Sequence, residues 1–103
     1  MDDRELLELA AKAAGLKVIY NAGDRGLWLP EEDDEWNPLT DDGDALRLAV
    51  KLEIDIAFYR KHVDATANSH GAAIVSEYGL KPDPYAATRR AIVRAAAEIG
   101  RKM

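Results

Sequence analysis

The residues best suited to chemistry form a five-residue acidic run that leads into a tryptophan: Glu31, Glu32, Asp33, Asp34, Glu35 and Trp36. Eight acids lie between Glu31 and Asp44, and no Lys or Arg lies between Leu27 and Leu46. Carboxylates are the ligands that hard divalent cations prefer. An EF-hand loop, however, needs Gly where this chain has Pro38 and Glu where it has Asp44. The spacing therefore predicts no specific metal site.

Two other interpretations of the acidic run remain. It can be a solvated loop that keeps a strand edge from aggregating. It can also form a negative surface that steers a basic partner protein or imitates nucleic-acid phosphate. Trp36 either anchors the run to the core or contacts a partner, since Trp is enriched in interface hot spots. We expect the run and Trp36 to form the partner-binding site.

The two histidines offer a second possible site. His62 and His70 flank an expected strand, with Asp64 and Ser69 nearby, so a Ser-His-Asp set or a two-His metal site can be drawn. Neither a nucleophile elbow nor a His-x₃-His pair is present. The glycine-containing turn at 23–26 joins two expected strands and precedes no helix, so it does not predict a phosphate cradle. The sequence thus predicts no catalytic residue, no metal and no cofactor.

Positive charge gathers at the other end of the chain. The last expected helix carries four arginines that can contact phosphates: Arg89, Arg90, Arg94 and Arg101. They can equally pair with the acidic half, within the chain or across a homodimer. Residues 1–52 hold 13 acids against 6 Lys/Arg, and residues 53–103 hold 6 against 8. Nucleic-acid binding through these arginines is the alternative function. It is disfavoured because nucleic-acid phosphates would repel the acidic half of the chain.

Length and composition indicate one globular domain over residues 1–103. Hydrophobic residues make up 48% and charged residues 32% of the chain, and there is no Cys, which excludes disulfides and thiolate chemistry. No apolar segment approaches the roughly 18 residues that a membrane span needs. The acidic start, Met1-Asp2-Asp3, lacks the basic region of a signal peptide. We therefore expect a cytoplasmic protein.

Hydrophobic periodicity and capping signals predict the elements that position these residues. Asp83-Pro84 is the clearest helix start, and Ile54, Ile56 and Phe58 alternate as in a strand. Tyr85 is placed in the buried stripe of the last helix. Short connections between strands favour a largely antiparallel sheet covered by helices, the α+β class, in the order α-β-β-α-β-β-β-α. The expected ranges are a helix at 3–14, strands at 17–20 and 26–29, a helix at 42–52, strands at 54–59, 63–67 and 72–78, and a helix at 84–100.

Two family resemblances follow from these segments. Residues 42–102 resemble a double-stranded-RNA-binding domain in element order, but the last helix opens Asp83-Pro84-Tyr85-Ala86 where that family has lysines. Residues 36–46, Trp-Asn-Pro-Leu-Thr-Asp-Asp-Gly-Asp-Ala-Leu, and 83–92, Asp-Pro-Tyr-Ala-Ala-Thr-Arg-Arg-Ala-Ile, more closely resemble small phage and prophage proteins, including those with the phage α-β-α sandwich domain. That resemblance implies an accessory protein in the bacterial cytoplasm and brings no catalytic residues. We expect a non-enzymatic protein that binds a host or phage protein.

Overall fold

The computed structural model describes residues 2–21, 26–69 and 72–103 and confirms the α+β class. It differs from the expected order by one additional strand, and its strands form two three-stranded antiparallel sheets in the orders β1-β2-β3 and β4-β5-β6. The elements are α1 (Asp3–Ala14), β1 (Ile19–Asn21), β2 (Gly26–Leu29), β3 (Asp34–Trp36), α2 (Asp42–Lys51), β4 (Asp55–Phe58), β5 (His62–Ser69), β6 (Ala72–Gly79) and α3 (Pro84–Arg101).

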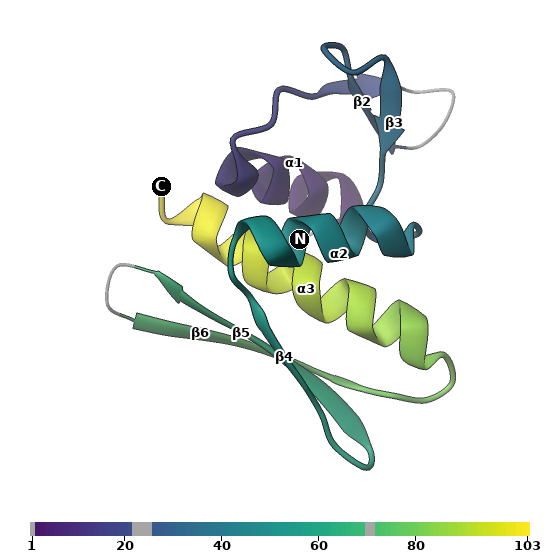
Figure 1. Ribbon diagram of the computed structural model, residues 1–103, viewed down its shortest axis with the longest axis vertical. Coiled ribbons are helices and arrows are strands. Elements are labelled where there is room, and N and C mark those ends of the chain that lie inside the picture. Colours follow the sequence, from purple (N-terminus) through teal and green to yellow (C-terminus); the bar gives the residue numbers. More distant parts are fainter. Residues whose placement is uncertain (1, 22–25, 70–71) are drawn as a thin grey trace.

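Helix α3 occupies the middle layer of the molecule (Figure 1). The sheet β4–β6 lies on one side of it, and α1 and α2 lie on the other. Burial on both sides explains why α3 is rich in small residues: Ala91, Val93 and Ala95 are fully buried. Small side chains let helix backbones approach closely, and at Gly100 an added Cβ would overlap the carbonyl oxygen of Leu9 in α1.

Side-chain and backbone caps hold the helix ends, and the helix start at Asp83-Pro84 forms as predicted. The Asp2 carboxylate accepts a hydrogen bond from the Glu5 backbone N–H at 2.8 Å, and Gly15 ends α1 with φ 70°. Asp41 caps α2, and Asp83 caps α3 with Pro84 in the first turn. These contacts satisfy backbone donors that a helix leaves without partners at its start.

The larger sheet presents one face to α3 and leaves the other open. Val63, Ala65 and Ala67 of β5 are buried against the helix layer. Because side chains alternate along a strand, the alternate residues of β5, beginning with His62 and Asp64, belong to the open face. The cluster of His62, Asp64 and Glu77 described below lies on this face.

The smaller sheet corrects the expectation that residues 31–37 are only loop. Asp34–Trp36 forms β3 because it pairs with β2 in a register that sets Trp36 opposite Leu27, and both residues are buried. The small sheet stands apart from the larger one, beyond the helices (Figure 1). The hydrophobic pairing of one Trp thus converts half of an acidic segment into a strand.

Two aromatic side chains are not where the periodicity placed them. Tyr85 is 70% exposed, although it was placed in a buried stripe, and Phe58 is 64% exposed, although it shares the strand face of the buried Ile54. Each lies at the end of its element, where the face is correct but the neighbouring layers no longer cover it. Among the described residues, no helix has the length and hydropathy required to cross a membrane.

Candidate functional site

The acidic run begins in the β2–β3 connection and continues into β3, and all five acids are exposed. Trp36 beside it is only 4% exposed, so its side chain anchors the hairpin in the core, and it also lines the cavity between the hairpin and α2. Within the described residues, Glu31 Oε1 forms an ion pair with Lys17 Nζ at 3.7 Å, between largely exposed groups. Ion pairs between exposed side chains contribute little to folding stability. The structure therefore places the five acids at the surface and Trp36 in the core beside them.

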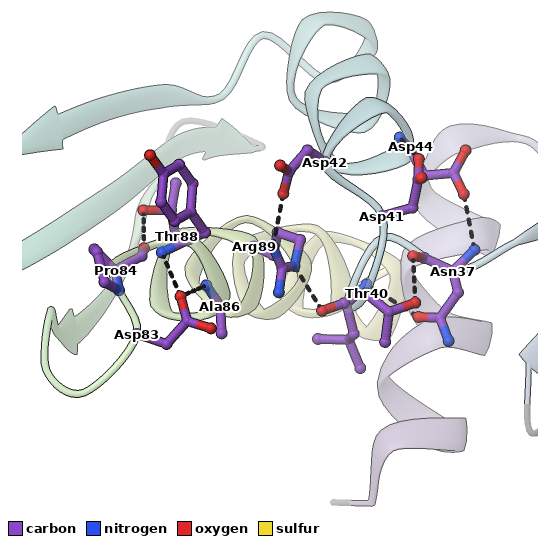
Figure 2. Close-up of polar contacts among 12 residues, drawn as sticks. Asn37, Thr40, Asp41, Asp42, Asp44, Asp83, Pro84, Ala86, Thr88 and Arg89 are labelled. Carbon is purple, nitrogen blue, oxygen red and sulfur yellow. Dashed lines mark hydrogen bonds and ion pairs between the residues drawn. The ribbon is translucent and has the colours of Figure 1, made fainter.

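The segment after Trp36 is held by a local hydrogen-bond network (Figure 2). Asp44 Oδ2 accepts from the Asn37 backbone N–H at 3.0 Å, and Asn37 Oδ1 accepts from the Leu39 N–H at 3.1 Å. Asp41 Oδ2 accepts from the Asp44 N–H at 2.8 Å as the α2 cap. Asp41 and Asp44 therefore stabilise the start of α2. The acids that remain as candidates for partner binding are residues 31–35.

Three of the four arginines on α3 are ion-paired inside the chain. The Arg89 guanidinium donates to the Leu39 carbonyl at 2.8 Å and to Asp42 at 2.6 Å (Figure 2). Arg90 forms an ion pair with Asp3 of α1 at 3.1 Å. Arg101 forms one with Glu98 on its own helix at 2.8 Å. The hydrogen bond from Arg101 also lowers the pKa of Glu98. Arg94 is exposed and, in the described part of the chain, shows no ion pair within 4.0 Å.

An apolar groove that the sequence did not predict lies between α2, α3 and β4. Its volume is about 430 Å³, and its rim is formed by Leu46, Phe58 and Tyr85. These three side chains are 61%, 64% and 70% exposed, while Ile92 at the groove is buried. Their position in the sequence could have indicated this exposure, because Phe58 ends its strand and Tyr85 lies in the first turn of its helix. At the end of an element, an apolar periodic pattern does not ensure that a neighbouring element covers the side chain.

Helix α2 separates this groove from a second, more polar cavity. The second cavity, also about 430 Å³, is bounded by Arg47, Leu48 and Lys51 of α2 and by the hairpin residues Glu32 and Asp34. On the outer side of α2, Val50 is 69% exposed one turn after Leu46. The acidic hairpin and the apolar groove thus flank the same exposed helix.

The histidine region assembles differently from the expected sets. His70 lies outside the described residues, so neither the Ser-His-Asp nor the two-His arrangement is tested. His62 and Asp64 are instead brought together with Glu77 of β6, their ligand atoms all lying within 4.8 Å of one another. Glu77 could not be predicted because the expected strands, 63–67 and 72–78, leave a four-residue turn between them, whereas β5 and β6 pair up to Ser69↔Ala72.

The arrangement of described residues therefore offers two surfaces flanking α2 and one cluster of metal-type ligands on the open sheet face. Comparison with protein-family models, with curated proteins and with solved structures found no match to this chain.

Proposed function

We propose that this chain is a non-enzymatic protein-binding domain whose partner lies across α2. Apolar side chains of the partner enter the groove between α2, α3 and β4, and basic groups face the acidic hairpin at 31–35. The observation that carries the proposal is the exposure of Leu46, Phe58 and Tyr85 around one groove. On the resemblance of two segments to phage proteins, the partner is a host or phage protein in the bacterial cytoplasm.

The groove has the composition of an interface core. Large apolar side chains that gather on a surface lose favourable burial, at about 25 cal/mol per Å² of apolar area, unless a partner covers them. Aromatic residues are enriched at the centres of protein interfaces, and two of the three rim residues, Phe58 and Tyr85, are aromatic. Val50, exposed on the same helix as Leu46, would extend the apolar contact along α2.

The acidic hairpin supplies a preference for the charge of the partner. Five exposed acids lie on the β2–β3 connection and the start of β3, and the first half of the chain has a net charge of −7 from 13 acids and 6 Lys/Arg. Such a field speeds encounter with a basic surface and contributes more to association rate than to final affinity. We therefore assign the groove to affinity and the hairpin to steering.

The test combines capture and kinetics. The untagged wild-type chain is coupled to resin, partners from bacterial lysate are identified by mass spectrometry, and the binding of each purified candidate is measured by interferometry. In the double variant Leu46→Ser/Tyr85→Ser the dissociation rate should rise at least tenfold. Neutralising residues 31–35 with Ser and Gln should instead slow association and remove its salt dependence, because the steering field is lost.

The matched control is Val75→Ser, which removes an apolar side chain that is 58% exposed on the open face of the sheet β4–β6, the face away from the groove. This variant should bind as the wild type does. A groove variant that keeps wild-type affinity while folded would overturn the assignment of the groove, and a wild-type chain that captures no partner would overturn protein binding itself.

Nucleic-acid binding is the competing function that the same material can test. Arg89, Arg90 and Arg101 are engaged within the chain, which leaves little free positive charge on α3. We expect no binding to duplex DNA or RNA at low salt, where phosphate contacts are strongest. Salt-sensitive binding that Arg94→Gln weakens would favour the alternative.

A further inference from the structure

We propose that His62, Asp64 and Glu77 bind a divalent transition-metal ion of the Zn²⁺ type on the open face of the sheet β4–β6. The site lies on strands that do not form the acidic hairpin, and the inference does not depend on the proposed protein-binding function. Strand geometry, an unsatisfied carboxylate, a pair of facing acids and a fixed imidazole support it in turn.

Strand register places the three side chains on one face. His62 and Asp64 are two residues apart in β5, so their side chains point the same way, and Glu77 pairs directly with Asp64 across the β5–β6 ladder. Their ligand atoms lie within 4.8 Å of one another. The distance from His62 Nε2 to Asp64 Oδ1 is 3.5 Å. Two ligands each about 2.0–2.2 Å from a tetrahedral zinc ion are roughly 3.3–3.6 Å apart, so this edge already has the required length.

One oxygen of the Asp64 carboxylate lacks a hydrogen bond within the described residues. Its Oδ1 atom is buried and accepts no hydrogen bond from any described residue. Leaving a buried acceptor unsatisfied costs about 1–3 kcal/mol, and more for a charged group. A cation between this oxygen and its neighbours would supply the missing interaction.

A second unfavourable feature points to the same remedy. Asp64 and Glu77 are directly opposed across antiparallel strands, where like charges destabilise the pair. No Lys or Arg in the described part of the chain forms an ion pair with either acid within 4.0 Å. A bound divalent ion turns this repulsion into shared coordination.

The imidazole is held in place for coordination. The ring of His62 stacks on Tyr59, with centroids 4.6 Å apart and an interplanar angle of 15°. The turn between β4 and β5 fixes both residues, since the Tyr59 N–H donates to the His62 carbonyl at 2.8 Å. A metal-binding histidine needs its orientation set by a neighbour, and stacking supplies that here.

The ligand set decides the class of ion. Imidazole nitrogen favours Zn²⁺ and its transition-metal neighbours over Mg²⁺ and Ca²⁺, which take oxygen ligands. Two carboxylates and one imidazole provide three protein ligands and leave a further position for water or a partner group. The site is therefore of the open, three-ligand type.

The test measures metal binding by calorimetry and by thermal unfolding with ZnCl₂, on chain without a polyhistidine tag, because a tag would itself bind zinc. We expect one Zn²⁺ per chain and a rise in Tm that MgCl₂ and CaCl₂ at the same concentration do not produce. His62→Gln, Asp64→Asn and Glu77→Gln should each weaken zinc binding at least tenfold and remove the rise in Tm, since even outer-shell losses cost about 10–100-fold.

Two controls separate this site from other carboxylates and the other histidine. Asp55→Asn removes an exposed acid on the same sheet face, and His70→Gln removes the second histidine of the chain. Both should bind Zn²⁺ as the wild type does. Glu77→Gln without metal should be at least as stable as the wild type because it relieves repulsion, so its loss of binding would not reflect unfolding. The site would be overturned if the wild-type chain bound no stoichiometric Zn²⁺, or if Asp64→Asn and Glu77→Gln bound Zn²⁺ with the affinity of the wild type.

Discussion

Replacement of Gly100 by Ala tests the close approach of α1 and α3 that organises the fold. An added Cβ would overlap the Leu9 carbonyl oxygen and lie 2.8 Å from that carbonyl carbon. Helix propensity alone would make the substitution stabilising by about 0.5–1 kcal/mol. Overpacking against backbone costs about 1–3 kcal/mol, because a carbonyl cannot rotate aside as a flexible side chain can. The net expectation is a loss of about 0.5–2 kcal/mol, the opposite sign to the propensity effect.

The assay is urea unfolding followed by circular dichroism, with a thermal scan as a check. A loss of this size lowers the Tm by roughly 2–16 °C in a domain of this length. The control is Gly79→Ala, whose new Cβ would have its nearest neighbour, the Lys61 carbonyl oxygen, at 4.0 Å; it should be neutral or stabilising. Adding Leu9→Ala to Gly100→Ala should not rescue stability, since the clash is with backbone. A Gly100→Ala protein as stable as the wild type would refute the described approach of the two helices.

Two further predictions concern the charged network. Arg89→Met should reduce unfolding free energy by about 1.5–3 kcal/mol in urea titrations, because it leaves the Leu39 carbonyl without its charged donor, whereas Arg90→Met removes an exposed pair and should cost less than about 1 kcal/mol; equal losses would contradict the structural role of Arg89. The hydrogen bond from Arg101 lowers the pKa of Glu98, so the stabilisation from this pair is present above the unfolded carboxyl pKa and disappears as pH falls through the lower folded value. Glu98→Gln should therefore reduce the drop in Tm on acidification below about pH 4.3, and an unchanged pH profile would argue against the pair.

The helices were readily predicted because their signals are local. Asp2, Gly15 and Asp83-Pro84 act within a few residues of their own positions, and each caps or ends a helix. The alternation of Ile54, Ile56 and Phe58 likewise identified strand β4, since period-two patterning depends on the residue sequence alone. The α+β class followed from these elements and the short connections between them.

The candidate sites were less predictable because they depend on partners distant in the sequence. β3 forms only where Trp36 can pair with Leu27 across the hairpin, and the acidic composition of the segment concealed this. Phe58 and Tyr85 have the right periodicity for burial but lie beyond the layers that would cover them. The positive charge of α3 could be counted from the sequence. Which acids pair with its arginines depended on how α1 and α2 pack against α3.

The sequence by itself therefore determined the helices, their caps and most strands, because hydrogen bonds and apolar faces at fixed spacing act over a few residues. The tertiary structure alone decided how the charges and aromatic side chains are used. It buried Trp36, joined Arg89 to Asp42, exposed the apolar groove beside α2 and set Glu77 opposite Asp64. The physical reason is strand register and layer packing: shifting one strand by a single residue or one helix by a turn would give the same local signals and a different surface.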